Sequence, residues 1–112
     1  MIAINATVTR PTVAGIYTDF GIPGTYSLAP TDVPAKYRLT LTGSLANDIR
    51  AAIAQTHLGL ESAVLANAMA KLECYKLLEN ILAEAGIHYN MMWILDDWSC
   101  NDTEAEALVY ID

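Results

Sequence analysis

The chain has 112 residues, of which 54% are apolar and 17% are charged, and its formal net charge at pH 7 is −7. The apolar fraction excludes a disordered chain, and the length predicts one domain over residues 1–112. The negative charge argues against direct nucleic-acid binding and against adsorption to anionic membranes, because both draw their affinity from Lys and Arg. With so few charged residues, part of the molecular surface is expected to be apolar. We expect this apolar surface to be buried in a homodimer or against a partner protein.

Residues 1–42 have the pattern of strands and loops. Residues 2–9 alternate with the period of a strand, and residues 13–20 and 25–28 are rich in β-branched and aromatic side chains. Residues 21–24 between them are turn-forming, which predicts a hairpin. Residues 36–42 alternate long polar and apolar side chains, which predicts a half-buried strand.

Residues 44–86 have the pattern of helix. Ser44 is a favourable N-cap, and no proline follows it. One helix over this length would span about 65 Å at about 1.5 Å per residue, which exceeds the diameter of a domain of this size. Gly59 is unfavourable in a helix interior, so we place a break at residues 57–59 and predict helices over residues 45–57 and 60–85.

The second helix has apolar residues at steps of three and four, which predict its buried stripe. The stripe comprises Leu60, Val64, Ala68, Leu72, Tyr75, Leu78, Leu82 and Ala85, widened by Leu65 and Met69. Cys74 beside it is expected to be a small core residue, and Gly86 the residue just past the helix end. The leucines at 58, 65 and 72 leave two alternatives open, namely packing on the chain's own sheet and helix-mediated homodimerisation.

The C-terminal segment predicts a return to the sheet. Residues 91–95 form a short apolar run that predicts a buried strand with Trp93 in the core, residues 96–102 predict a polar loop, and residues 107–111 predict a terminal strand. The predicted fold class is therefore α+β, with an N-terminal antiparallel sheet built of hairpins, a central two-helix segment and a C-terminal strand returning to the sheet.

Negative charge is concentrated at this end. All six basic residues lie at or before Lys76, whereas eight of the thirteen acidic residues follow it. We expect an acidic, aromatic partner-binding surface that fits a basic face on another protein. Its members are Asp96, Asp97, Trp98, Asp102 and Glu104, with Trp98 as the exposed anchor.

No metal, cofactor or catalytic signature is recognisable. Read as a calcium-binding EF-hand loop starting at Asp97, the segment has Asp102 at the glycine position and Leu108 at the bidentate glutamate position. Neither a phosphate-binding loop nor a dinucleotide fingerprint occurs. A catalytic set would have to combine His88 and Cys100 with the neighbouring acids at a subunit interface.

Cysteine usage indicates the compartment. Cys74 and Cys100 are too few for a disulfide framework, and their spacing is no metal motif. The first residues lack the pattern of an export signal, and no apolar stretch is long enough for a membrane span. We expect a cytoplasmic protein with two free thiols.

The function that these patterns favour is a small acidic noncatalytic protein-binding module, of the inhibitor, immunity or adaptor type. Two alternatives remain open. One is a structural or assembly subunit of a homo-oligomer or of a viral or bacterial particle, which the apolar composition favours. The other is a small enzyme with its site at a subunit interface.

Overall fold

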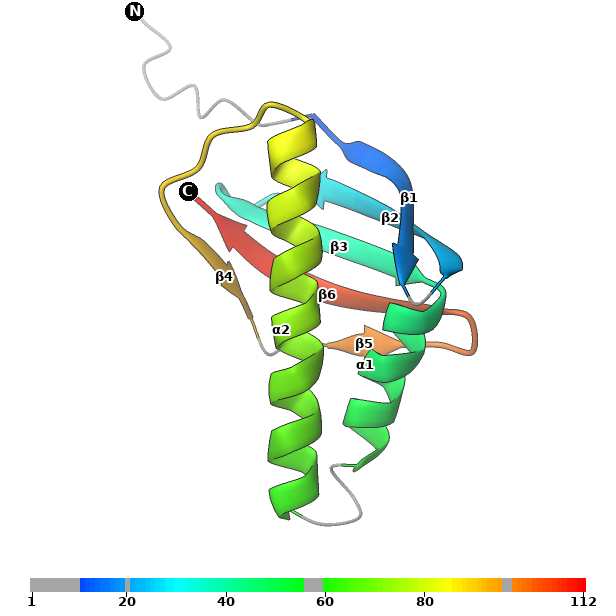
Figure 1. Cartoon of the computed structure of the whole chain (residues 1–112). Coiled ribbons are helices and arrows are strands. Elements are labelled where there is room, and N and C mark those ends of the chain that lie inside the picture. Colours follow the sequence, from blue (N-terminus) through cyan, green and yellow to red (C-terminus); the bar gives the residue numbers. More distant parts are fainter. Residues whose placement is uncertain (1–10, 20, 56–59, 96–97) are drawn as a thin grey trace, which may run out of the picture.

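The computed structural model describes residues 11–19, 21–55, 60–95 and 98–112 (Figure 1). Within them the elements are β1 Val13–Asp19, β2 Ile22–Pro30, β3 Lys36–Thr42, α1 Ser44–Gln55, α2 Leu60–Glu84, β4 Met92–Ile94, β5 Ser99–Cys100 and β6 Glu104–Ile111. The predicted α+β class, with strands before the helices and a C-terminal strand bonded to the sheet, is confirmed. The strand predicted over residues 2–9 and the helix break predicted at 57–59 lie outside the described residues.

The sheet is antiparallel, with the strand order β1-β2-β3-β6-β4, and β5 also pairs with β6. The C-terminal strand therefore lies inside the sheet, between β3 on one side and β4 and β5 on the other. It begins at Glu104, three residues before the predicted start. Pairing along both edges explains this extension, because residues 104–106 find backbone partners in β3 and β5.

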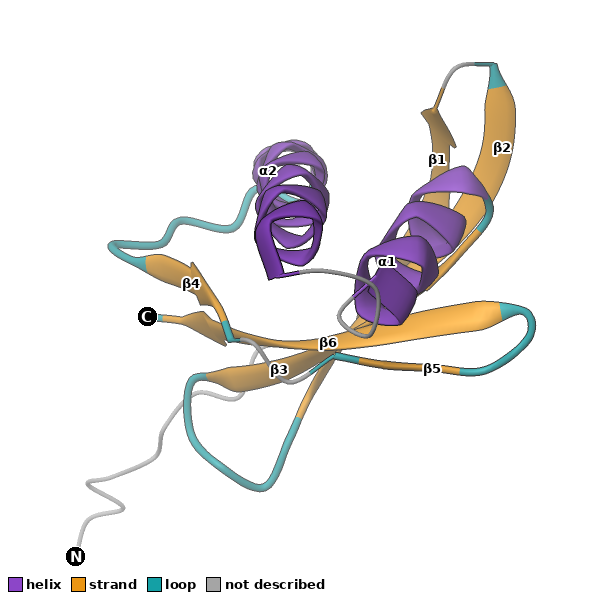
Figure 2. Ribbon diagram, turned by 90° about the horizontal axis from the view of Figure 1, so that it is seen from below, coloured by secondary structure: helices purple, strands orange, loops and turns teal. Residues whose placement is uncertain are grey.

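Both helices cover the same face of the sheet, here called the inner face (Figure 2). Alternate residues of β3 and β6 point to it and form the core, namely Tyr37, Leu39, Leu41, Ala105, Ala107, Val109 and Ile111. Leu45, Ala46, Ile49 and Ala52 of α1 are buried in the same cluster. The remaining residues of these strands point to the outer face, over which no described helix lies.

The first hairpin is tighter than predicted. Asp19 pairs with Ile22, so β2 begins at Ile22 rather than at residue 25, and Gly21 takes a φ of 77° in the connection. Only glycine adopts such a φ without steric cost, which is why the chain can reverse here.

Two glycine–tyrosine pairs shape the hairpin further. Gly15 pairs with Tyr26 and Gly24 with Tyr17, and in each pair the tyrosine ring lies on the glycine of the opposite strand. The Tyr17 hydroxyl donates a hydrogen bond to the carbonyl oxygen of Thr42 at the end of β3. Figure 2 shows the resulting curl, in which β1 and the start of β2 rise beside α1.

The buried side of α2 differs from the predicted stripe. Ala70, Cys74, Leu78 and Leu82 are buried at four-residue steps, which confirms Cys74, Leu78 and Leu82 as core residues. The predicted stripe is wrong at six positions, which are exposed instead, namely Val64, Leu65, Ala68, Met69, Leu72 and Ala85. The helix is apolar around much of its circumference, so periodicity alone does not select the buried side.

The C-terminus of α2 confirms the prediction for Gly86. Its φ is 70°, its N–H donates to the carbonyl oxygen of Ala83 at 3.1 Å, and the N–H of Ile87 donates to Leu82 at 2.9 Å. This is the Schellman motif, in which a glycine in the left-handed conformation lets the chain satisfy the last carbonyl groups and leave the helix. The chain then crosses to β4 at the edge of the sheet.

Candidate functional site

Three of the five predicted partner-binding residues, Trp98, Asp102 and Glu104, lie within the described part of the chain, and they differ in exposure. Asp96 and Asp97 lie outside the described residues, and Asp102 is exposed in the turn between β5 and β6. Glu104 is half-buried at the start of β6. Trp98 is not the exposed anchor that we expected, because its side chain packs against the core and its Nε1 donates a 2.9 Å hydrogen bond to Asn67 Oδ1.

The β5–β6 turn uses its polar atoms internally. Asn101 Oδ1 accepts hydrogen bonds from the N–H groups of Thr103 and Glu104, each at 2.9 Å. Arg50 Nη1 of α1 donates to the carbonyl oxygens of Asn101, at 3.1 Å, and Asp102. A guanidinium group in this position opposes a cation, and no group of three or more His, Cys, Asp and Glu side chains suited to a metal occurs among the residues described.

The residues proposed for catalysis do not meet within the described chain. The backbone N–H of Asn90, two residues after His88, donates to Asp112 just past the C-terminal end of β6. Cys100 instead pairs with Ala105 near the start of β6. Ala105 and Asp112 are seven residue steps apart, which is about 23 Å at about 3.3 Å per residue. His88 and Cys100 therefore lie at opposite ends of the strand.

The other thiol, that of Cys74, is chemically inert. Its side chain is fully buried in α2, and this burial, followed in importance by the charge of Glu73, raises its pKa from 9.0 to about 12. The thiolate is the nucleophilic form, and almost none is present at neutral pH. Cys74 is a core residue, as its place in the helix predicted.

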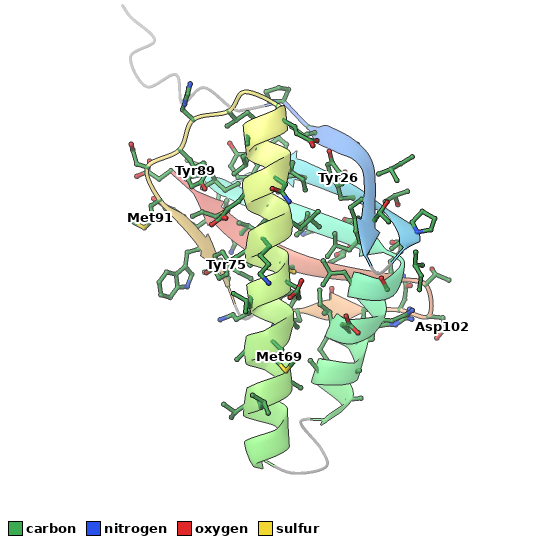
Figure 3. All side chains as sticks on the ribbon, in the orientation of Figure 1. Tyr26, Met69, Tyr75, Tyr89, Met91 and Asp102 are labelled. Carbon is green, nitrogen blue, oxygen red and sulfur yellow. The ribbon has the colours of Figure 1, made fainter. Side chains whose placement is uncertain are left out.

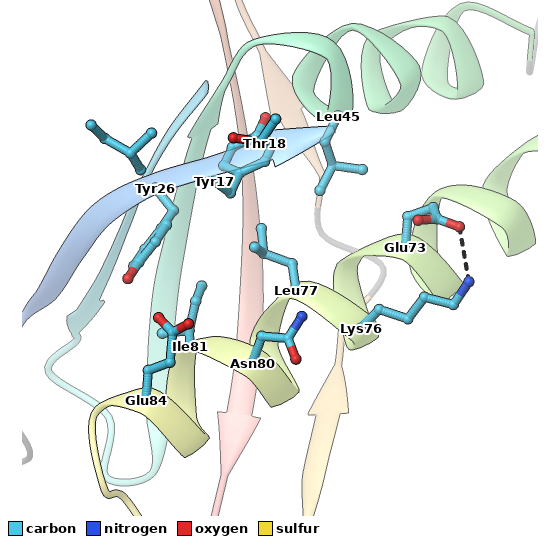
Figure 4. Close-up of a pocket in the computed structure, with 11 residues that line it drawn as sticks. Tyr17, Thr18, Tyr26, Leu45, Glu73, Lys76, Leu77, Asn80, Ile81 and Glu84 are labelled. Atoms are coloured by element: carbon cyan, nitrogen blue, oxygen red, sulfur yellow. Dashed lines mark hydrogen bonds and ion pairs between the residues drawn. The ribbon is translucent and has the colours of Figure 1, made fainter. Parts of the chain in front are cut away.

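A cleft of about 410 Å³ opens between the β1–β2 hairpin and α2 (Figure 4). Tyr26 and Glu84 lie at one end, and Glu73 and Lys76 at the other, where Lys76 Nζ contacts Glu73 Oε1 at 3.3 Å. No buried side-chain nitrogen or oxygen among the described residues lacks a hydrogen-bond partner, so the cleft contains no polar group that requires a ligand.

Trp93 is on the outer face of the sheet, and its predicted place in the core is wrong. Met92 packs against the core and Ile94 is fully buried, so alternation along β4 turns Trp93 the opposite way, where its side chain is 58% exposed. Trp93 pairs with Tyr110 of β6, and the two rings therefore stand side by side on the outer face.

The register of β3, β6 and β4 brings cationic side chains next to this aromatic pair. Lys36 pairs with Tyr110, so that Lys36, Tyr110 and Trp93 form one row across three strands. Arg38 pairs with Leu108 in the next row. We call these five residues, Lys36, Arg38, Trp93, Leu108 and Tyr110, the sheet-face patch.

A hollow of about 270 Å³ adjoins the patch. Its lining includes Arg38 and Leu108 of the patch together with Ser99 and Glu106. Arg38 Nη1 lies 4.0 Å from Glu106 Oε2, and both side chains are solvent-exposed, so this ion pair holds Arg38 only weakly. The hollow thus places polar groups beside an exposed apolar surface.

Sequence alternation could have placed Lys36, Arg38, Leu108 and Tyr110 on one face, because residues 36–42 and 104–111 each have a period of two. It could not have joined Trp93 to them, since that requires the pairing of β4 with β6. The sequence does not reveal the patch because residues 91–95 are apolar at every position, so they have no alternation that would place Trp93 on one face.

Comparison with known proteins adds no assignment. The chain matches no family model, no curated protein and no solved structure at a significant level of similarity. Within the described residues, neither helix is long and apolar enough to cross a membrane. A proposal for the function therefore depends on the exposed surfaces of the chain itself.

Proposed function

We propose that this chain is a noncatalytic protein-binding module and that the sheet-face patch binds the partner. The observation that carries the proposal is Trp93, which is 58% exposed beside Tyr110 on a sheet face that no described helix covers. Trp, Tyr and Arg are the residues most enriched among interface hot spots, and the patch contains all three. Adjacent exposed apolar side chains on an uncovered face are typical of protein–protein contact sites.

The charges of the outer face indicate the chemistry of the partner. Lys36 and Arg38 lie beside the aromatic pair, whereas Glu104 and Glu106 lie toward the start of β6 on the same face. A complementary partner has an apolar pocket for Trp93, acidic groups facing the two cations, and basic groups facing the two glutamates. In this arrangement, the basic face that the sequence predicts on the partner contacts Glu104 and Glu106.

A protein partner is favoured over single-stranded nucleic acid. Exposed aromatic rings with neighbouring cations on a sheet can stack nucleobases. Here, however, Glu104 and Glu106 lie on the same face, and the chain has a net charge of −7. Phosphate groups would be repelled by these two glutamates and by the net negative charge of the chain. Nucleic-acid binding depends instead on cations that displace the counterions of the phosphates.

The test is capture of the partner with matched variants. The tagged chain, Trp93→Ala, Arg38→Glu and the control Tyr89→Ala are each incubated with extract from the native cells at low salt. Tyr89 is an exposed aromatic residue outside the sheet and thus controls for loss of a ring. We expect one stoichiometric protein that binds the unchanged chain and Tyr89→Ala equally and binds Trp93→Ala at least about 10-fold more weakly.

Two results would count against this function. One is a partner that Trp93→Ala and Arg38→Glu retain at full strength, because the sheet-face patch would then not be the binding surface. The other is a complex that nuclease treatment destroys, which would identify the ligand as nucleic acid. Release by salt, with retention after nuclease treatment, supports a protein partner with complementary charges.

A second candidate function, that of an assembly subunit, is favoured by one observation. Four large apolar side chains on the first half of α2 are between 54% and 63% exposed. Apolar surfaces of this kind mark contacts between protein molecules. Self-association that depends on protein concentration but not on salt would support this function.

A further inference from the structure

Strand β1 forms one end of the sheet, and its outer edge is unprotected. Its register with β2 runs without a bulge over all seven residues, and residues 13–18 include neither a proline nor a charged side chain. Charged residues, prolines, bulges and short length are the devices that keep an edge strand from pairing with another chain. Among the described residues, no segment pairs with this edge. It is therefore accessible to a further strand.

The main-chain groups of this edge belong to alternate residues. The N–H of Thr31 donates to the carbonyl oxygen of Lys36 at 3.0 Å, in the register that pairs β2 with β3. Successive residues of an antiparallel sheet point their main-chain groups to opposite neighbours, so the odd-numbered residues of β2 face β3 and the even-numbered ones face β1. The β1 partners of the even-numbered residues are odd-numbered. The N–H and C=O groups that point away from β2 are therefore those of Ala14, Ile16 and Thr18.

This edge borders the cleft between the hairpin and α2. Ile16 and Thr18 line the cleft, and Tyr26 extends from the hairpin toward the C-terminal half of α2 (Figures 3 and 4). The main-chain groups of the edge are open to water, so they do not require a ligand, but they are accessible to one.

The opposite wall of the cleft is one side of α2. Its residues lie three, four, seven and eleven positions after Glu73, which is the spacing of a single helix face. They are Lys76, Leu77, Asn80 and Glu84. The cleft thus has the edge of a strand on one side and helical side chains on the other.

We propose that this cleft, here called the edge cleft, binds an extended peptide of a partner protein as an additional strand beside β1. The outward groups of β1 recur at every second residue, about 6.7 Å apart, and an extended main chain has donors and acceptors with the same repeat. In this binding mode the main-chain hydrogen bonds provide affinity, and alternate side chains provide selectivity. The cleft volume of about 410 Å³ lies in the lower part of the range of about 300–1,000 Å³ that is typical of ligand sites, which suits one extended chain rather than a second folded domain.

The side chains of α2 indicate the chemistry of the peptide. Leu77 is half-buried in the middle of the cleft and offers an apolar contact. At one end Glu73 contacts Lys76 at 3.3 Å, whereas Glu84 at the other end is exposed beside Tyr26. A carboxylate next to an aromatic ring attracts a cationic side chain. We therefore expect a Lys or Arg of the peptide near Glu84 and an apolar residue facing Leu77.

Selection from a phage-displayed library of linear peptides, each as long as β1, tests the binding mode. We expect enriched sequences with β-branched residues and with Lys or Arg at one end, and synthetic copies should bind the tagged chain in fluorescence anisotropy. Methylation of one peptide amide at a time should weaken binding at least about 10-fold at every second position and much less at the positions between, because only alternate amides face β1. The absence of enriched peptides, or equal sensitivity at all positions, would overturn the proposal.

Ile16→Pro removes one donor from the edge itself. The N–H of Ile16 points away from β2, and proline is tolerated on edge strands at such positions. We expect the peptide affinity to fall at least about 10-fold while the circular dichroism spectrum stays unchanged. The control Ile16→Ala removes the exposed side chain but keeps the N–H, and it should retain the affinity. Equal losses in the two variants, or full binding by Ile16→Pro, would contradict pairing with β1.

Glu84→Lys tests the charge contact. Peptides with Lys or Arg at the end near position 84 should bind this variant about 10-fold more weakly, and peptides with Glu there should bind it more tightly. The control Glu79→Lys makes the same change on an exposed part of α2 outside the edge cleft. The same loss in both variants would show that only the net charge matters, and this would overturn the assigned contact.

The edge cleft goes beyond the proposed function and does not depend on it. Strands β1 and β4 lie at opposite ends of the strand order, so the edge cleft and the sheet-face patch can bind at the same time. Trp93→Ala should bind the selected peptides unchanged, and Ile16→Pro should retain the partner of the sheet-face patch, so the two proposals fail separately. Sedimentation velocity provides one further check. Dimers of the unchanged chain that Ile16→Pro converts to monomers would assign the edge to a second copy and overturn the peptide.

Discussion

Trp98 Nε1 donates a hydrogen bond of 2.9 Å to Asn67 Oδ1, across 31 positions of sequence. This contact holds Trp98, just before β5, against the side of α2. It also explains why the tryptophan in the charged segment is partly buried. Trp93, in the apolar run, is exposed instead. The relative exposure of the two tryptophans is thus the reverse of what their sequence neighbours predicted.

Trp98→Phe tests the structural role of this contact. The ring is retained but the hydrogen bond is lost, which leaves Asn67 Oδ1 without its indole donor, so we expect the free energy of unfolding to fall by about 1 kcal/mol. Urea denaturation monitored by circular dichroism measures the change. The matched control Trp93→Phe should change stability by less than about 0.5 kcal/mol, because Trp93 is exposed. Equal effects of the two substitutions would contradict the assigned roles.

Gly24→Ala should destabilise the hairpin by about 2–3 kcal/mol, which is the cost of overpacking. A Cβ atom at Gly24 would collide with the carbonyl oxygen of Thr42 and lie 2.6 Å from the Tyr17 ring. Gly21→Ala is the control, because a Cβ there meets nothing within 4 Å and only the φ of 77° is unfavourable, at about 1 kcal/mol. Thermal unfolding of both variants compares the two losses of stability. A smaller loss for Gly24→Ala than for Gly21→Ala would show that the strands can move apart to accommodate the new methyl group.

The Cys74 thiol makes stability depend on pH in the alkaline range. Its pKa rises from 9.0 to about 12 on folding, so the unfolded chain loses this proton at a lower pH than the folded chain does. Between pH 9 and pH 12 the unfolded state binds fewer protons, and the free energy of unfolding falls by up to about 1.4 kcal/mol per pH unit. Cys74→Ala should remove this contribution. Urea denaturation from pH 8 to pH 10.5 measures the slope in both proteins, and identical slopes would refute the shift.

Arg50→Ala should loosen the β5–β6 turn. The guanidinium of Arg50 donates to the carbonyl oxygens of Asn101 and Asp102, and its loss should cost about 1 kcal/mol, a modest value because the site is exposed. Amide hydrogen exchange at Thr103 and Glu104 should accelerate. Arg38→Ala is the control, since its 4.0 Å ion pair with Glu106 contributes little to stability. Unchanged amide hydrogen exchange at Thr103 and Glu104 in Arg50→Ala would show that the hydrogen bonds to Asn101 are sufficient to stabilise the turn.

The sequence by itself determined the local elements. Alternation over residues 36–42 gave β3 with its observed bounds, the helical pattern from Ser44 gave both helices to within two residues, and Gly86 marked the end of α2. These features depend on neighbours along the chain, through backbone conformation and the periods of helix and strand. The α+β class follows from their order.

Only the tertiary structure decided which surfaces are exposed. Leu72 and Leu78 are both apolar residues of α2, yet Leu72 is 54% exposed and Leu78 is fully buried. A helix with apolar residues around much of its circumference has no unique inward side until α1 and the sheet select one. Trp93 is likewise exposed because β4 pairs with β6 in one register, and a shift by a single residue would have turned it into the core. Long-range pairing therefore determined both the sheet-face patch and the exposed side of α2.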